Sequence, residues 1–342
     1  MTKIWFNRWF SVAYHYIHMI RSNPDQQPFV FYGTHPDPNH MHLQACDYAF
    51  VEPTVKGAEY VQFCLDFCRQ HGIDIFIPRL HMYDIAEQIE RFEAIGTKVM
   101  VCRDLTLLHQ LMNKHLFYEA LQNTDVVTLP SYRVVNTAAQ FKQAYEELTS
   151  EGNKVCFKPT NSEGGMGFRI IAERSNPLEE MYGWVTLRTS FEEAYKAFSS
   201  KEWFDGIMVM ELLEGDEYSI DCLSSAEGKL LTAIPRRKST GRVYELEKLP
   251  ALLDVAERVA ARYRIPYVFN IQVKYNRGIP KLLEINPRMS GGLYISCLSG
   301  VNIPYLAVKE IQGQSFVVPE PKFDMQISYI EQPVVLKSHV GH

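Results

Sequence analysis

A lysine beside a glycine-rich loop is the feature of this chain best suited to chemistry. Lys158 ends a short apolar strand, and Gly164, Gly165 and Gly167 follow in the loop that leads to a second strand at residues 168–172. Glycine lets backbone N–H groups approach an anion because it has no Cβ, and consecutive N–H groups form an anion-binding concavity. The lysine adds a full positive charge. This spacing predicts a phosphate-binding lid between two strands.

The loop differs from two commoner phosphate loops. A Walker A loop needs Gly-Lys-Ser or Gly-Lys-Thr at its end, whereas Gly167 is followed by Phe168. The dinucleotide fingerprint opens a helix, whereas a strand follows here. Because glycine-rich hairpins are often simple turns, the phosphate interpretation depends on the rest of the chain.

A second polar set occurs on two alternating segments between residues 267 and 292. Alternate side chains of a strand share a face. A five-residue loop, Asn276 to Pro280, would place Gln272 opposite Glu284 and Asn270 opposite Asn286. The gathered oxygens suit Mg²⁺, with Mn²⁺ as the alternative ion, because such ions prefer carboxylate and amide oxygens. The competing interpretation is a solvated hairpin face.

Arg288 lies two residues beyond this set and is followed by Ser290-Gly291-Gly292 after one methionine. A guanidinium group can hold a phosphoryl oxygen through two parallel hydrogen bonds. A solvated hairpin face explains the alternation but not this combination of amide, carboxylate and guanidinium groups. We therefore favour a metal and phosphoryl site.

Together these segments resemble the ATP-grasp superfamily, and within it the carbamoyl-phosphate-synthetase-like branch of carboxylate-activating ligases. The resemblance covers about residues 105–312, with four motifs in the family's order. They are Asn113-Lys114 on a helix, Lys158 with its glycine loop, Met210-Glu211-Leu212-Leu213-Glu214-Gly215-Asp216-Glu217-Tyr218-Ser219, and Glu284-Ile285-Asn286-Pro287-Arg288. Each motif is weak alone, whereas four in order are specific.

The resemblance implies a role for each matched residue. It implies that the phosphates of ATP are held by Lys114, Lys158, Gly164, Gly165 and Gly167, that adenine is bordered by Glu211 and Leu213, and that the ribose is bordered by Glu217. It implies that the metal ion is held by Gln272, Glu284 and Asn286. The catalytic residues that it implies are Arg288, Lys158 and Arg237. Many members of the family have an acid where this chain has Gln272, so its metal site carries less negative charge, and whether one or two ions bind stays open.

The function implied is an ATP-dependent carboxylate–amine or carboxylate–thiol ligase. Such an enzyme forms an acyl phosphate and releases ADP and phosphate. One alternative is a carbamoyl-phosphate-type or kinase-like enzyme that stops at the phosphorylated product. Another, from a different class, is a catalytically silent ATP-binding sensor. The expected partners are a small carboxylate and an amine, and a homodimer is the assembly to test.

The resemblance implies an α/β chain with an ATP-grasp α+β fold, preceded by a small Rossmann-like parallel domain. The first hundred residues alternate short apolar strands with helices, a pattern typical of parallel sheets. The expected strands are 3–6, 29–32, 48–51, 74–77 and 98–101. Three helices are expected: one that follows the first strand and ends near residue 21, one at 60–71 and one at about 85–95. We expect domains at 1–104 and 105–312, with a lid at about 129–210 and an extension at 313–342. We also expect one helix capped by Asp104 that carries Lys114 near its middle.

Composition limits the class of protein. The 342 residues carry a net charge of −5 without a basic block, which argues against nucleic acid as the main partner. No apolar stretch reaches membrane-spanning length. Seven scattered cysteines fit reduced thiols in the cytoplasm, and we interpret Cys64 and Cys68 as core residues of a helix.

Two further groups have competing interpretations. His35, His40 and His42, with Asp37, offer ligands that zinc accepts, but their spacing matches no known zinc site, so a structural loop or the rim of a substrate site is favoured. The cationic run 236–238, which includes Arg237, is either a solvated loop or a group that closes on the transferred phosphoryl or the substrate carboxylate, with Arg242 as a further candidate.

Overall fold

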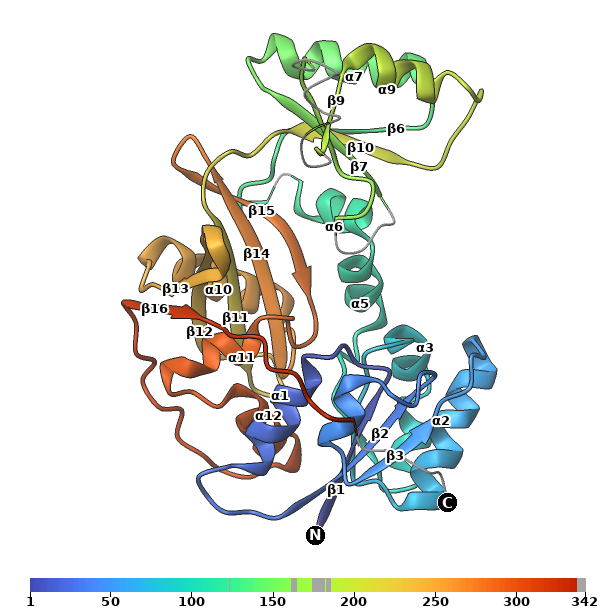
Figure 1. Ribbon diagram of the computed structural model, residues 1–342, viewed down its shortest axis with the longest axis vertical. Helices are drawn as coiled ribbons and strands as arrows, with labels where there is room; N and C mark the ends of the chain where they lie inside the picture. The colour runs from blue at the N-terminus through green and yellow to red at the C-terminus, as the bar shows by residue number, and fades with distance from the viewer. Residues whose placement is uncertain (123, 161–164, 174–181, 183–185, 337–342) are drawn as a thin grey trace. The chain divides into compact units, whose positions relative to one another are not determined.

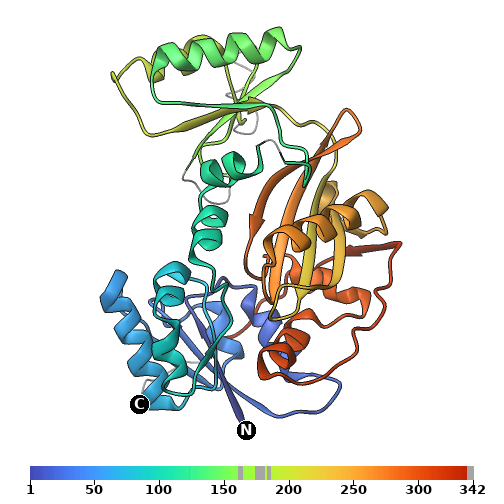
Figure 2. The ribbon, with the colours of Figure 1, turned by 180° about the vertical axis from the view of Figure 1, so that it is seen from behind.

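A computed structural model describes residues 1–122, 124–160, 165–173, 182 and 186–336. The chain forms two compact units. One comprises residues 1–109, 216–273 and those from 284 onward, and the other comprises 110–215 and 274–283. Figures 1 and 2 show the chain from opposite sides.

The N-terminal part of the first unit is a five-stranded parallel sheet, as predicted. Its order is β3-β2-β1-β4-β5. The strands are β1 (Thr2–Asn7), β2 (Phe29–His35), β3 (Tyr48–Val51), β4 (Ile75–Ile77) and β5 (Lys98–Val99), and the helices are α1 (Ala13–Arg21), η1 (Met41–Ala45), α2 (Gly57–His71), α3 (Met82–Glu87) and α4 (Ile89–Glu93). The expected helix at 85–95 is divided because Gln88 leaves helical geometry, at φ −107° and ψ 20°.

Different helices cover the two faces of this sheet, as both ribbon views show. Ile4 and Phe6 belong to the core cluster that contains the buried face of α1. Trp5 points to the other face, where its ring lies 4.5 Å from that of Phe67 on α2. The alternation of side chains along β1 therefore fills two apolar layers.

A six-stranded sheet, ordered β15-β14-β11-β12-β13-β16, follows in the later part of the chain. Its strands are β11 (Glu217–Ser224), β12 (Leu230–Lys238), β13 (Val243–Leu246), β14 (Val268–Asn276), β15 (Ile279–Asn286) and β16 (Met325–Ser328), and its helices are η2 (Thr240–Arg242), α10 (Pro250–Tyr263), α11 (Leu293–Ser296), η3 (Cys297–Ser299) and α12 (Ile303–Gln312). The segment after α12, which the sequence left without an element, supplies the edge strand β16.

One core cluster joins the parallel sheet to the later elements of the first unit. It contains residues of β1 and α1 together with buried residues of β12, β14 and α12. Asn302, at the start of α12, also donates to the backbone of Met19 on α1 at 2.8 Å. The N-terminal sheet is thus packed as part of this unit.

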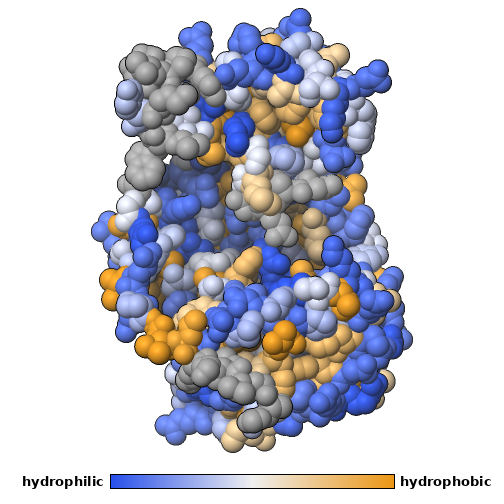
Figure 3. All heavy atoms as spheres, turned by 45° about the vertical axis from the view of Figure 1, so that its right-hand side comes forward, coloured by the Kyte–Doolittle hydropathy of each residue, from blue (hydrophilic) through white to orange (hydrophobic). Residues whose placement is uncertain are grey.

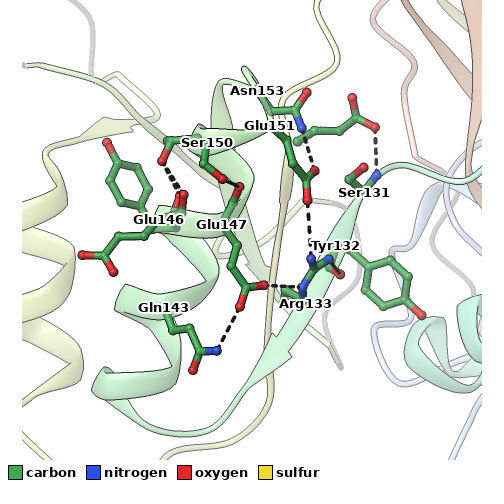
Figure 4. Close-up of polar contacts among 12 residues, drawn as sticks. Ser131, Tyr132, Arg133, Gln143, Glu146, Glu147, Ser150, Glu151 and Asn153 are labelled. Atoms are coloured by element: carbon green, nitrogen blue, oxygen red, sulfur yellow. Dashed lines mark hydrogen bonds and ion pairs between the residues drawn. The ribbon is translucent and has the colours of Figure 1, made fainter.

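The second unit is built on a five-stranded sheet ordered β6-β10-β7-β8-β9. Its elements are α6 (Lys114–Leu121), β6 (Tyr132–Val135), α7 (Ala138–Ser150), β7 (Val155–Pro159), β8 (Arg169–Ile171), β9 (Arg188–Thr189), α9 (Phe191–Phe198) and β10 (Ile207–Glu211). The core of this sheet includes Phe141, Phe157 and Val209. Arg133 on β6 points to α7, where its guanidinium lies 2.8 Å from Glu147 and 3.5 Å from Glu151 (Figure 4).

The predicted single helix around Lys114 is wrong. α5 (Leu105–Met112) ends at Asn113, whose backbone is extended and whose side chain accepts from the amides of His115 and Leu116. Asn113 therefore starts a new helix, and Lys114 is the first residue of α6. The predicted cap at Asp104 is confirmed, because its carboxylate accepts from the amide of Leu107 at 2.9 Å.

The surface and the cysteines agree with the composition. On the face drawn in Figure 3, hydrophilic side chains are interspersed with smaller hydrophobic groups. All seven cysteines are buried and free, and Cys64 and Cys68 lie in the core as predicted. Within the described ranges, no helix combines the length and the apolar character that a membrane crossing requires.

Candidate functional site

The predicted lid is the loop of an antiparallel hairpin. β7 pairs with β8 through Cys156 with Ile170 and Phe157 with Arg169. Lys158 is therefore placed on β7 just before the loop. Burial raises the pKa of the Cys156 thiol to about 12, while the charges of Lys158 and Lys274 act to lower it. Two lysines thus lie near one buried thiol.

The described end of the lid is a tight turn. The amide of Phe168 donates to the carbonyl of Gly165 at 3.2 Å. Gly165 and Gly167 have φ of +79° and +74°, which favours glycine. A Cβ on Gly167 would lie 2.7 Å from Cδ of Pro159. Gly164 lies outside the described residues, so its predicted role stays a prediction.

A cavity of about 430 Å³ opens in the second unit beside this hairpin. Its apolar wall comes from β8 and the segment after β10, and its polar wall contains three cationic side chains. The lining residues are Lys154, Ile170, Ile171, Ala172, Arg188, Leu212, Leu213, Glu214 and Lys274. The volume lies within the range of small-molecule sites. Apolar walls with cations suit a flat heterocycle that carries negative charge.

The two predicted adenine residues have different surroundings. Leu213 lines the cavity, whereas Glu211 is 2% exposed and its carboxylate has three partners. The amide of Ser131 and Nδ2 of Asn276 donate to it at 2.8 Å each, and Lys281 forms an ion pair with it. Burial tends to raise the pKa of Glu211, but these hydrogen bonds outweigh it and lower the pKa. The Glu211 side chain therefore fastens β10 to the tip of the β14–β15 hairpin.

The predicted metal and phosphoryl residues are joined by hydrogen bonds along β15. Nδ2 of Asn286 donates to Oε1 of Glu284 at 2.9 Å, and Nη2 of Arg288 donates to Oδ1 of Asn286 at 3.3 Å. All three side chains are half-buried. They present a carboxylate, an amide oxygen and a guanidinium group on one row, as alternation predicts.

The predicted loop between β14 and β15 is too long. β14 continues to Asn276 and β15 begins at Ile279, so only Arg277 and Gly278 connect them. Both have positive φ, 50° and 79°, as a two-residue hairpin turn requires. The counting that placed Gln272 opposite Glu284 therefore does not apply. Gln272 is half-buried on β14, the strand beside β15.

The cationic run 236–238 belongs to β12 and not to a solvated loop. Arg237 lies among three carboxylates: it is ion-paired with Glu245, and its guanidinium lies 3.3 Å from Glu247 and 3.7 Å from Asp216. Glu217, the predicted ribose residue, begins β11 and is half-buried.

Arg236, also in the run, is buried beneath the site. It faces Asp221 at 3.4 Å, and both are at most 5% exposed. Asp221 also accepts from Asn270 at 2.9 Å, from Ser290 at 2.6 Å and from Ser296 at 2.5 Å. Asn270 thus supports the site from within, and it does not join Gln272 on an open patch. This network fastens β14 to the turn that follows Arg288.

The histidine loop is a packed structure. The rings of His35 and His40 stack at 3.8 Å, and Nδ1 atoms of His40 and His42 lie 2.8 Å apart. Burial and the neighbouring imidazoles lower the pKa of His42 to about 3. Among the described residues, no group of three or more His, Cys, Asp or Glu side chains is arranged to hold a metal ion.

Sequence reasoning missed several residues of these sites. Lys274 lines the cavity, and it lies two positions after Gln272 on β14, so alternation puts both side chains on one face of the strand. Lys154 and Glu214 face each other across the cavity wall at 2.7 Å, although they are 60 positions apart, so no local pattern identifies them. The structure brings together Glu284, Asn286 and Arg288 in one unit, and Lys158 and Leu213 lie in the other, where Lys114 begins α6.

The chain is similar to known proteins in sequence and in fold. Residues 203–333 match the family described as ATP-grasp in the biosynthetic pathway with Ter operon. The fold is similar to that of an N5-carboxyaminoimidazole ribonucleotide synthetase solved with ADP, with a TM-score of 0.67 and 13% identity over 95% of this chain and 80% of that one. The predicted resemblance to the ATP-grasp superfamily is confirmed by this match and by the fold. The parallel N-terminal sheet followed by antiparallel sheets is the predicted ATP-grasp architecture.

Two curated proteins are similar to parts of this chain in sequence. It is 24% identical over 225 residues to the arginine-specific carbamoyl phosphate synthase large chain of Geobacillus stearothermophilus, covering 62% of this chain and 20% of that protein. It is 28% identical over 146 residues to human carnosine synthase 1, covering 39% of this chain and 17% of that protein. The chain therefore spans about a fifth of the length of either relative.

Proposed function

We propose that this ATP-grasp protein is an ATP-dependent ligase that joins a small carboxylic acid to an amine, or to a thiol, through an acyl phosphate. The observation that carries the proposal is the hydrogen-bonded row Glu284–Asn286–Arg288. A protein that only senses ATP needs no guanidinium group beside the residues proposed to bind the metal ion, Glu284 and Asn286. The similarity to carnosine synthase supports an amine as the acceptor.

We assign the nucleotide base to the cavity beside the β7–β8 hairpin. The apolar side chains of Ile170, Ile171 and Leu213 can pack on a purine ring, and the cavity volume is sufficient. Lys158, Lys114 and the lid glycines are the proposed phosphate ligands. Glu217 remains our candidate for the ribose hydroxyls. The similar synthetase was solved with ADP, which supports an adenine nucleotide as the ligand.

The donor set on β15 fits a hard divalent cation. Glu284 offers a carboxylate and Asn286 an amide oxygen, and Gln272 on the adjacent strand offers another. Mg²⁺ binds through one or two carboxylates and completes its shell with water and phosphate oxygens. Held by these residues, the ion would supply positive charge that offsets the charge of the nucleotide phosphates. Since the set contains one carboxylate, one ion is favoured over two.

The chain's own groups position the reactants and neutralise charge. In the proposed reaction, a carboxylate oxygen of the acid forms a bond to the γ-phosphorus, and the bond from that phosphorus to ADP breaks. Arg288 holds the oxygens of the resulting acyl phosphate through its planar fork. The acceptor nitrogen or sulfur then attacks the acyl carbon, phosphate leaves, and the acceptor loses a proton. Arg237 remains a catalytic candidate, and for that role its guanidinium must exchange one carboxylate for the substrate.

A screen of acids with Mg·ATP, with and without amines, tests the proposal. We expect ADP release that depends on an acid and rises with an amine, together with an amide product. AMP in place of ADP would contradict the acyl-phosphate route. ADP release without any amine, with accumulation of a phosphorylated acid, would favour the kinase-like alternative.

A further inference from the structure

The turn after Arg288 carries a backbone carbonyl that the arginine side chain contacts. Nη1 of Arg288 donates to the carbonyl oxygen of Met289 at 3.1 Å. That carbonyl belongs to the peptide unit that joins Met289 to Ser290, and a peptide unit is planar. A rotation of this unit would therefore move the oxygen away from the guanidinium group. The contacts that hold Ser290 thus also act on Arg288.

Ser290 is held through its side chain by a buried carboxylate. Its hydroxyl donates to Oδ1 of Asp221 at 2.6 Å, and the two residues are 6% and 1% exposed. Asp221 is itself fixed on β11, because Asn270 on β14 donates to the same oxygen and Arg236 on β12 faces the other oxygen. Hydrogen bonds to a charged group are about twice as strong as those between neutral groups. Three neighbouring strands thus determine where Ser290 is bound.

A second contact holds Ser290 through its backbone. The hydroxyl of Tyr16 on α1 donates to the carbonyl oxygen of Ser290. Tyr16 is fully buried, and its burial together with the charge of Asp221 raises the pKa of the hydroxyl, which therefore keeps the proton that it donates. Helix α1, which packs in the core of the first unit, thus contacts the turn beside Arg288.

Gly292 lets the same turn approach the buried arginine. Its amide donates to Oγ of Ser290 at 3.3 Å. A Cβ on Gly292 would overlap the guanidinium group of Arg236. A glycine is therefore required where the turn lies against the Asp221–Arg236 pair.

We propose that Ser290 is a positioning residue for Arg288, held by Asp221 and Tyr16 so that the guanidinium group is oriented toward the acyl phosphate. This inference rests on the proposed function, in which Arg288 holds the oxygens of that intermediate. A small displacement of a positioned group can lower the rate strongly. Since none of these contacts involves a residue proposed to bind ATP, loss of the Ser290 hydroxyl should lower kcat and leave the KM for ATP unchanged.

A matched pair of serines tests the proposal. Ser290→Ala and Ser296→Ala each remove a buried hydroxyl that donates to Asp221, at 2.6 and 2.5 Å, but only Ser290 adjoins the carbonyl that Arg288 contacts. The assay uses the full chain with Mg·ATP and the acid and amine that give the fastest ADP release in the screen. We expect Ser290→Ala to lower kcat by about tenfold or more, at an unchanged KM for ATP.

The control variants separate positioning from stability. Ser296→Ala should keep nearly the wild-type kcat although it also loses a bond to Asp221. Ser290→Thr keeps the hydroxyl and should recover part of the rate that Ser290→Ala loses. Equal losses of kcat in the two alanine variants, a KM for ATP that rises with the loss, or full activity of Ser290→Ala would overturn the inference.

Tyr16→Phe tests the other contact of the turn. The variant removes the hydroxyl that donates to the Ser290 carbonyl and keeps the ring in the core. We expect kcat to fall at an unchanged KM for ATP. If Ser290→Ala does not fold, this variant decides the inference, and a wild-type kcat for Tyr16→Phe would overturn it.

Side-chain mobility separates this inference from the proposed function. If the wild-type chain forms no ADP with any acid of the screen, the ligase proposal fails, and the motion of Arg288 then decides the inference. The Nε–H signal of Arg288 in the chain labelled with ¹⁵N-arginine is assigned by its loss in Arg288→Lys. The heteronuclear NOE of this signal should fall in Ser290→Ala and stay unchanged in Ser296→Ala. An unchanged NOE in Ser290→Ala, or an equal fall in both variants, would refute the positioning role.

Discussion

Asn286 donates a hydrogen bond of 2.9 Å from Nδ2 to Oε1 of Glu284, two positions earlier on the same strand. The amide oxygen of Asn286 faces Arg288, whose Nη2 donates a hydrogen bond to it at 3.3 Å. One strand thus aligns a carboxylate, an amide and a guanidinium group. The alignment connects the ion proposed at Glu284 to the oxyanion proposed at Arg288.

Glu284→Gln should abolish activity without unfolding the chain. The variant keeps the shape but removes the negative charge that holds the ion, so ADP release with Mg·ATP should fall by about 10²-fold or more. Glu284 is half-buried, so the free energy of unfolding should change by no more than about 1 kcal/mol. Exposed Glu202→Gln serves as the control. Normal turnover by Glu284→Gln would remove the metal assignment.

Gly165→Ala and Gly167→Ala form a matched pair in the lid. Both residues have positive φ, so each alanine should destabilise its conformation by about 1 kcal/mol or more. Only Gly167→Ala also brings a Cβ to 2.7 Å from Pro159, whereas Gly165 has open space. We expect Gly167→Ala to raise the KM for ATP more strongly than Gly165→Ala. Steady-state kinetics measure this, and equal effects would show that the close approach does not matter.

The sequence predicted the architecture well because its patterns are local. Alternating apolar strands and helices identified the parallel sheet, and the alternation in β15 placed Glu284 and Asn286 on one face. The hairpin loop was too long by three residues because Asn276 and Ile279 extend the strands, and a two-residue turn at Arg277-Gly278 suffices. The helix break at Asn113 depends on a side-chain cap whose signal is short.

Other parts of the site could not be predicted because they join distant segments. The guanidinium groups of Arg79 and Arg288 both lie near the ring of Phe10. Arg79 is 69 positions after Phe10 in the sequence, and Arg288 is 209 positions after Arg79. Asp221 gathers Asn270, Ser290 and Ser296 in the same way. No periodicity encodes such meetings, since they follow from the packing of whole elements. Of the two alternatives for the run 236–238, the solvated loop does not hold for Arg236, which is buried against Asp221, 15 residues away.

Lys281→Met should destabilise the second unit because it leaves the buried carboxylate of Glu211 without its cation. Breaking a buried pair in this way costs about 3–5 kcal/mol. Adding Glu211→Gln should recover part of the lost free energy of unfolding. The buried carboxylate is then replaced by a neutral amide, whose oxygen can still accept from the backbone amide of Ser131. Chemical denaturation of both single variants and the double variant gives the coupling energy. Additive losses would show that the ion pair contributes nothing.

His42 should make the chain sensitive to mild acid. Its pKa is lowered to about 3 by burial and by His40 and His35, against an ordinary value of 6.5. The unfolded chain therefore takes up this proton first, and stability is lost as pH falls from 6.5 toward 3. Between pH 7 and pH 5, His42 should remove about 2 kcal/mol from the free energy of unfolding. Denaturation of wild type and His42→Phe at both values measures it, and equal pH slopes would contradict the burial effect.

Oxygen transfer from the acid to phosphate tests the central claim most directly. The reaction is run with an acid that carries ¹⁸O in its carboxylate, an amine and Mg·ATP. If an acyl phosphate forms, one carboxylate oxygen leaves with the phosphate, so the released phosphate should carry one ¹⁸O per amide formed. Unlabelled phosphate formed at the same rate as the amide would contradict the acyl-phosphate route.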